Sequence, residues 1–198
     1  LAMNRVIGLG LNGEVRTRHL DEIVSFYRNC GVRRFFVQLS PAVQSVHLRN
    51  LLADKGFRHY NNWAKLKGPA AALPPPRPGA FEVRPIGKEQ AGIYGQLIFL
   101  SFGWEDSRLA GWFAESVSKP GFHHYLVYKG NKAVGAGALF ASGTTGALAM
   151  AGMLPEFRGQ GGQSLLLRSR IAQAQAMGCR LIVSETAEDT PAKPVVSY

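Results

Sequence analysis

The chain has 198 residues, of which 46% are hydrophobic and 10% aromatic, and it carries a formal net charge of +10. A chain of this length and composition can bury a core, which excludes an intrinsically disordered protein. It contains no apolar run of the roughly 18 residues that would span a bilayer and no signal-peptide pattern, so we expect a cytoplasmic protein with no membrane partner.

Two cysteines, Cys30 and Cys179, give neither a disulfide framework nor the spacing of a metal site, so no bound metal is expected. Most of the positive charge lies in residues 1–70. Such a basic half can attract nucleic acid or an acidic ligand. Its arginines are scattered, however, without the interleaved aromatic residues that stack on bases. A solvated basic surface is the favoured interpretation, and nucleic-acid binding with a steep salt dependence is the alternative.

The first 67 residues predict the order strand, helix, strand, helix, strand. The first strand alternates loosely and ends in a turn at Asn12-Gly13, and Thr17 is a suitable N-cap for the helix that follows. Both helices show apolar residues at helical spacing and end at a glycine. We expect the five elements at residues 4–15, 19–30, 34–39, 43–55 and 57–66.

A proline-rich stretch, Gly68–Gly79, separates the two halves of the chain. Five prolines and two glycines in twelve residues cannot continue a helix or a central strand, and they favour an extended polyproline-type spacer. The predicted organisation is therefore an N-terminal half domain of residues 1–67, a linker of residues 68–80 and a C-terminal domain of residues 81–198.

The second half begins with a short strand and two apolar helices, and Gly130-Asn131 predicts the turn of a hairpin. A further strand ends at Pro155, and a loop then leads into a helix and a last strand. We expect strands at residues 81–85, 124–129, 133–141, 147–154 and 181–185, and helices at residues 89–102, 109–117 and 163–177.

The loop after Pro155 carries Arg158, Gly159, Gly161 and Gly162. Loops of this build leave backbone N–H groups at a helix N-terminus, where the helix dipole favours negative charge. Residues 157–170 contain no acidic side chain and three arginines, the last two being Arg168 and Arg170. The pattern predicts a pyrophosphate cradle, and a flexible turn before a surface helix is the alternative for a glycine cluster alone.

An internal repeat relates the two halves. Cys30–Ser40 aligns with Met177–Thr186, and in each copy an amphipathic helix ends at glycine and an arginine precedes a buried strand. The strand before that helix recurs as well. The loop does not, because Asn12–Arg18 lacks the glycine cluster and contains Glu14. One cradle is therefore expected, in the second half.

Residues 81–198 resemble a GCN5-related N-acetyltransferase (GNAT) domain. The run Met153-x-Pro155-x-Phe157-Arg158-Gly159-x-Gly161 matches the family's R-x-x-G-x-G/A coenzyme A loop, between a strand and a helix. The resemblance implies an α/β fold with a mixed sheet, the GNAT acyl-CoA N-acyltransferase fold. Residues 1–67 resemble the latter half of a second, degenerate GNAT domain, so we expect a tandem protein truncated at both ends.

The resemblance implies direct transfer of acetyl from acetyl-CoA to an amine. The strand end at Met153 and Leu154 would pair with the pantetheine arm like an added strand. An N–H there, assigned to Leu154, would polarise the thioester carbonyl and stabilise the oxyanion. Backbone N–H groups of the loop would hold the pyrophosphate. The residues expected to bind acetyl-CoA are Met153, Leu154, Arg158, Gly159, Gln160, Gly161, Gly162, Gln163 and Ser164.

The base that takes the amine's proton is less well defined. Glu185, at a strand end beside the site, is the first candidate, with a solvated carboxylate as the alternative. Glu105 and Asp106 lie on the loop where family members often form the acceptor site, although most loop carboxylates are simply solvated. His123 and His124 lead a strand, where histidines are usually structural. A water-relayed base stays open.

Two departures from the family pattern keep a second function open. Gln163 stands where the motif has a small residue, which could crowd the turn unless Gly162 takes over the close approach. Residues 190–198 lack the asparagine that often precedes the family's last helix, and Tyr198 is a weak candidate for the general acid. The alternative is a catalytically silent acyl-CoA-binding or sensor module. The acceptor stays open among a small amine, an amino acid, an antibiotic and a protein N-terminus.

Overall fold

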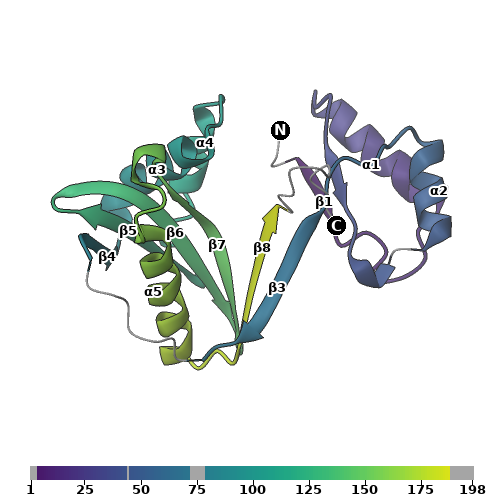
Figure 1. Cartoon of the computed structure of the whole chain (residues 1–198). Coiled ribbons are helices and arrows are strands. Elements are labelled where there is room, and N and C mark those ends of the chain that lie inside the picture. The colour runs from purple at the N-terminus through teal and green to yellow at the C-terminus, as the bar shows by residue number, and fades with distance from the viewer. Residues whose placement is uncertain (1–3, 44, 72–78, 188–198) are drawn as a thin grey trace. The chain divides into compact units, whose positions relative to one another are not determined.

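A computed structural model describes residues 4–43, 45–71 and 79–187 (Figure 1). The chain divides into two compact units, Leu1–Ala64 with Thr186–Tyr198, and Lys65–Glu185. Within the described ranges, no helix combines the length and the apolar character that crossing a membrane requires. The predicted division at residues 67 and 80 stays a prediction, and residues 72–78 of the predicted linker lie outside the described part.

The N-terminal unit follows the predicted order for its first four elements, whereas the fifth predicted strand, at residues 57–66, begins only at Trp63 and belongs to the sheet of the second unit. Strands β1 (Arg5–Ile7) and β2 (Phe36–Gln38) pair in parallel, with Arg5 opposite Phe36. Helix α1 (Thr17–Asn29) lies between them in the chain, and η1 (Pro41–Val43) and α2 (Val46–Asp54) follow β2. A small apolar core joins both helices to the loop after β1, and it is formed by Val15, Leu20, Leu48 and Leu52.

Three boundaries in this unit differ from the prediction for physical reasons. The first strand ends at Ile7 because Gly8 and Gly10 adopt φ angles of 84° and 82°, which break the extended conformation. Helix α1 has Arg16 at its N-cap, so Thr17 is its first residue and not its cap. Helix α2 starts at Val46, since the Ser45 hydroxyl caps it by accepting a 3.0 Å hydrogen bond from the N–H of Leu48.

The second unit is built on a mixed six-stranded sheet of order β3-β8-β7-β6-β5-β4. Pairing is antiparallel from β4 to β7 and parallel between β7 and β8. Strand β3 begins at Trp63 and continues through Gly68 and Pro69, the first two residues of the predicted linker. Proline is tolerated there because β3 lies at the sheet edge. The strands are β3 (Trp63–Pro69), β4 (Phe81–Pro85), β5 (Phe122–Lys129), β6 (Lys132–Ser142), β7 (Thr145–Met153) and β8 (Leu181–Ala187).

Helices cover both faces of this sheet. Successive side chains of a strand point to opposite faces. A Cβ on Gly152 of β7 would meet Ser101 of α3, whereas the next residue, Met153, lies against Gly162 of α5. The sheet therefore separates α3 from α5. The helices of this unit are η2 (Lys88–Gln90), α3 (Ala91–Phe102), α4 (Arg108–Ala114), η3 (Pro155–Phe157) and α5 (Gly162–Ala176).

Strand β7 has two irregularities that shape its second half. Its register against β6 shifts by one residue, because Ala138 pairs with Ala149 but Gly137 pairs with Ala151. Met150 is the extra residue of this β-bulge and has a φ of 31°. The parallel pairs with β8 run only as far as Leu148 with Ser184 within the described residues, although β7 continues to Met153. Beyond that pair, β7 and β8 diverge (Figure 1).

Candidate functional site

The diverging half of β7 exposes a specific set of backbone groups. The N–H of Leu154 donates to the carbonyl oxygen of Val134 at 2.9 Å and so belongs to the ladder with β6. Because N–H direction alternates along a strand, the N–H groups of Met153 and Ala151 point to the opposite edge, toward β8. The assignment of the oxyanion donor to Leu154 is therefore wrong, since its N–H is engaged by β6. Met153 and Ala151 present the amides at this edge.

The loop that follows turns directly from β7 into α5. Residues 155–157 form the turn η3, and α5 begins at Gly162 with Gly161 as its N-cap. Gly159 and Gly161 adopt φ angles of 70° and 93°, a region that residues with a side chain rarely enter. The first N–H groups of an α-helix have no partner within the helix. Gly162, Gln163 and Ser164 therefore offer three such groups at the positive end of a 15-residue helix.

Gln163, which stands where the family motif has a small residue, does not lie at the closest contact of the loop. Gly162 is buried, and a Cβ there would lie 2.7 Å from the Cε of Met153. Gln163 is exposed. The close backbone approach is thus made by Gly162, and the larger residue at 163 faces outward.

The Arg158 side chain ties the loop to its surroundings. Its Nη2 donates to the carbonyl oxygen of Ser101 at 2.7 Å, and its Nε donates to that of Met153 at 3.2 Å. These bonds join the C-terminal end of α3 to the end of β7. Gln160 is held as well, because its side-chain oxygen accepts from the Nζ of Lys129 at 2.9 Å.

Two lysines of the β5–β6 hairpin lie beside the loop, and sequence reasoning missed them. The Nζ atoms of Lys129 and Lys132 lie 5.6 and 5.1 Å from the ring centre of Phe157. The predicted turn at Gly130-Asn131, which the structure confirms, was the available signal, because it folds the two strand ends back together. Arg168 is half-buried, while Arg170 is 3% exposed, so the expected contribution of Arg170 to the positive loop surface is wrong.

The candidate base lies on the diverged part of β8. Glu185 follows the last β7–β8 pair and forms an ion pair with Lys65 of the neighbouring strand β3. The Glu185 side chain is 42% exposed, so solvent reaches it. Its role as base stays a prediction.

The two candidate acceptor-site carboxylates differ in their surroundings. Asp106 accepts bonds from Nε and Nη2 of Arg108, both at 2.8 Å, and these bonds lower the pKa of its carboxyl group to about 2. Asp106 is therefore ionised, and Arg108 offsets its charge. Glu105 is exposed, as is Asp106. Beside them Trp104 stacks on Phe102 with ring centres 4.6 Å apart.

His124 has a structural environment. It is 3% exposed, and its Nε2 lies 2.9 Å from the hydroxyl oxygen of Ser116. Since the Ser116 hydroxyl donates to the carbonyl oxygen of Phe113 at 2.6 Å, the hydrogen in the histidine contact must come from Nε2. Burial, and to a smaller extent the charge of His123, lower the pKa of His124 to about 4. The ring is thus neutral near pH 7.

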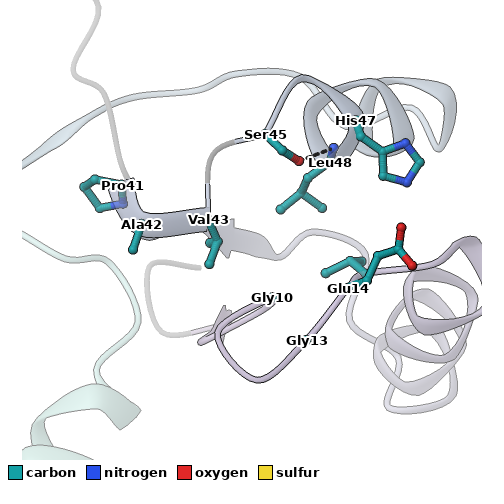
Figure 2. A pocket seen from close by; sticks show the side chains of 10 residues that line it. Gly10, Gly13, Glu14, Pro41, Ala42, Val43, Ser45, His47 and Leu48 are labelled. Carbon is teal, nitrogen blue, oxygen red and sulfur yellow. Dashed lines mark hydrogen bonds between the residues drawn. The ribbon is translucent and has the colours of Figure 1, made fainter.

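The N-terminal unit contains a cavity of about 430 Å³ that none of the predicted acetyl-CoA residues lines. Figure 2 shows Glu14 and His47 at one end of it and the turn Pro41–Val43 at the other. The capping bond from the N–H of Leu48 to Ser45 lies in its wall. The cavity therefore lies between the loop after β1 and the start of α2.

In the described residues, no group of three or more histidine, cysteine, aspartate or glutamate side chains could hold a metal ion.

Comparison with solved structures finds the same fold in other proteins. A GCN5-related N-acetyltransferase from Kribbella flavida superposes with a TM-score of 0.64 at 17% identity, covering 89% of this chain and 67% of that one. A functionally unknown conserved protein from Staphylococcus epidermidis ATCC 12228 also has a TM-score of 0.64, at 14% identity, covering 88% of this chain and 70% of that one. At these identities the likeness shows the fold alone. A comparison with curated protein sequences finds no match.

The sequence profile of the acetyltransferase (GNAT) family matches residues 93–195. This range covers more than half of the chain and contains most of α3 and all of β7, the glycine loop and α5. The chain belongs to the acetyltransferase (GNAT) family.

Proposed function

We propose that this protein transfers the acetyl group of acetyl-CoA to an amine acceptor at the diverging edge of β7. The main support for the proposal is that two binding surfaces, the open edge of β7 and the glycine loop, follow each other directly along the chain. The amides of Ala151 and Met153 face the open side of β7, and the chain then turns at once into the glycine loop at the α5 N-terminus. A thioester arm and a pyrophosphate joined in one molecule fit this order of groups.

The pyrophosphate would be bound by the loop. The N–H groups of Gly162, Gln163 and Ser164 point out of the first turn of α5, where the helix dipole favours an anion. Lys129 and Lys132 add positive charge beside them. The pantetheine arm would add to the edge of β7 as an extra strand, because the described part of β8 does not pair with that edge beyond Leu148.

The acetyl transfer would take place at the same edge of β7. An amide N–H of Ala151 or Met153 would donate to the thioester carbonyl oxygen, and such a donor contributes about 3–4 kcal/mol to the transition state where it has been removed in other enzymes. The amine nitrogen forms a bond to the carbonyl carbon, the carbon–sulfur bond then breaks, and the coenzyme A thiolate takes up a proton. An amine that arrives as a cation loses two protons, one before its nitrogen attacks and one as the amide forms. We propose that Glu185 accepts the first, directly or through a water molecule, and releases it to solvent, while the second goes to the thiolate.

The acceptor would approach from the side of the α3–α4 loop. Since Arg108 offsets the charge of Asp106, we propose that Glu105 is the carboxylate that attracts a cationic amine there. The stacked rings of Phe102 and Trp104 offer an apolar wall next to it. The proposal leaves a small amine, an amino acid, an antibiotic and a protein N-terminus as acceptor classes.

A second candidate function is a catalytically silent acyl-CoA-binding module. It is favoured by the ion pair between Glu185 and Lys65, which engages the best candidate base. Calorimetry with coenzyme A and a thiol-release assay over a panel of amines distinguish the two functions. Thiol release that depends on one class of amine supports the transferase. Tight binding without thiol release on any amine supports the silent module.

Gly161→Glu tests the cradle, because it places a carboxylate at a residue with a φ of 93° that precedes the free N–H groups of α5. We expect loss of detectable coenzyme A binding in a folded protein. The matched control is Gly143→Glu, in the β6–β7 turn, where the φ is also positive at 54° and a Cβ would meet nothing within 4 Å. Both changes carry a similar backbone cost of about 1–2 kcal/mol. Binding that survives in Gly161→Glu would place the cradle elsewhere.

A further inference from the structure

Arg170 is a buried cation of α5 that contacts main-chain carbonyl oxygens. Its Nη1 donates to the carbonyl oxygens of Ala138 at 3.0 Å and Ala149 at 3.2 Å, and its Nε lies 3.4 Å from that of Leu166. The ion pairs found among the described residues do not include it. A charge buried without an opposite charge is costly, so its place calls for a structural reason.

The two carbonyl groups lie on different strands at the same point of the sheet. Ala138 of β6 and Ala149 of β7 form the last regular pair before the register shift, and Met150 is the extra residue just after it. A bulge interrupts the ladder and leaves backbone groups in need of other partners. A single nitrogen of Arg170 supplies a partner to both strands and so holds them together at the bulge.

The bulge decides which amides of β7 face the open edge. A shift of one residue in register turns every group of a strand to the other side. Without Met150 as an extra residue, the N–H groups of Ala151 and Met153 would point into the β6 ladder. Those of Gly152 and Leu154 would face β8 instead. The edge on which the acyl-CoA would lie thus depends on a bulge held by Arg170.

We propose that Arg170 is a positioning residue, which holds the β7 bulge so that the amides of Ala151 and Met153 face the acyl-CoA. The inference rests on the proposed function for its ligand, and the state of the bulge itself is independent of any ligand. The guanidinium reaches both carbonyl groups from the α5 side of the sheet. It touches neither substrate nor the reacting atoms.

The test compares Arg170→Met and Arg170→Lys with the wild-type chain, and uses Arg180→Met as the matched control. Arg180 is exposed just before β8, so its replacement makes the same change in charge away from the bulge. Two quantities are measured in each protein. Amide hydrogen exchange at Gly152 and Leu154 in the ligand-free protein reports the register of β7. Calorimetry with coenzyme A, and the comparison of the KM for acetyl-CoA with kcat, report whether the edge of β7 still binds the acyl-CoA.

We expect Arg170→Met to exchange Leu154 at least ten-fold faster and to bind coenzyme A at least ten-fold more weakly. Arg170→Lys should recover part of both, because an ammonium group can reach one carbonyl oxygen, and Arg180→Met should match the wild type. A lower melting temperature in Arg170→Met with unchanged exchange and affinity would overturn the proposal. Should Arg170→Met not fold, Arg170→Gln replaces it, and wild-type exchange and affinity in that uncharged variant would overturn the proposal equally.

The two readouts separate this inference from the proposed function. The exchange measurement needs no cofactor, so it tests the bulge even if the wild-type chain binds no coenzyme A. In that event, faster exchange of Leu154 in Arg170→Met still supports the role of Arg170 in holding the bulge, whereas the missing coenzyme A binding refutes only the acetyltransferase proposal.

Discussion

Because the ring of His124 is buried, we predict that acid destabilises this fold and that replacing His124 removes this part of the acid dependence. Folding lowers the pKa of His124 from 6.5 to about 4, first because the ring is buried and second because of the charge on His123. Between these two pH values the unfolded chain binds a proton at this ring and the folded chain does not. The stabilisation is therefore complete above pH 6.5 and is lost as the pH falls toward 4. At pH 4 the loss amounts to about 3 kcal/mol.

Urea unfolding of the wild type and of His124→Gln, at pH steps from 8 to 4, measures this loss. Glutamine retains an N–H donor for the Ser116 hydroxyl but does not titrate, so the variant lacks the acid-dependent part. The carboxyl groups titrate in both proteins and cancel in the comparison. We expect the wild type to lose about 3 kcal/mol of unfolding free energy relative to the variant between pH 7 and pH 4.

The control for this test is a substitution of the neighbouring histidine, His123. His123→Gln changes the half-buried neighbouring ring and should follow the acid dependence of the wild type closely. If the wild type and His124→Gln lose unfolding free energy in parallel from pH 7 to pH 4, then His124 is not buried in the neutral form and the reasoning from its burial is refuted.

Two further predictions concern the sheet around the proposed site. Gly152→Ala would place a Cβ 2.5 Å from the Cβ of Ser101. We therefore expect the free energy of unfolding, measured in urea, to fall by about 1–3 kcal/mol. The second change Ser101→Gly should restore part of it, and no recovery in the double variant would contradict the contact. Glu185→Gln should lower kcat about 10²-fold with an unchanged KM for acetyl-CoA if Glu185 is the base. Lys65→Met, which removes only its ion-pair partner, should retain most of the rate, and an unchanged kcat in Glu185→Gln would exclude that role.

The order of elements could be predicted because it depends on local patterns, whereas the α/β fold with its mixed sheet was implied by the resemblance to a family. Apolar periodicity defined the helices, and glycine marked the loop in which Gly159 and Gly161 adopt positive φ angles. The resemblance to a family then added the coenzyme A motif, which no spacing alone would have made specific.

The register of β7 could not be predicted in the same way. The bulge falls on Met150, an ordinary residue that carries no local signal, and it alone decides that the N–H of Leu154 joins the β6 ladder. The assignment of the oxyanion donor to Leu154 failed for this reason. Arg170 illustrates the same limit, because its position on α5 does not reveal that the side chain ends among carbonyl oxygens of two strands.

Strand β3 has a consequence for dissecting this protein. The six-stranded sheet takes one of its edge strands from Trp63–Pro69, most of which precedes the proline-rich stretch. A recombinant fragment starting at Gly79 would contain the whole coenzyme A motif, yet it would leave β8 with an unsatisfied row of backbone groups and a tendency to associate with other chains. A fragment starting before Trp63 would retain that partner strand, so the boundary for truncation lies ahead of β3 and not at the prolines.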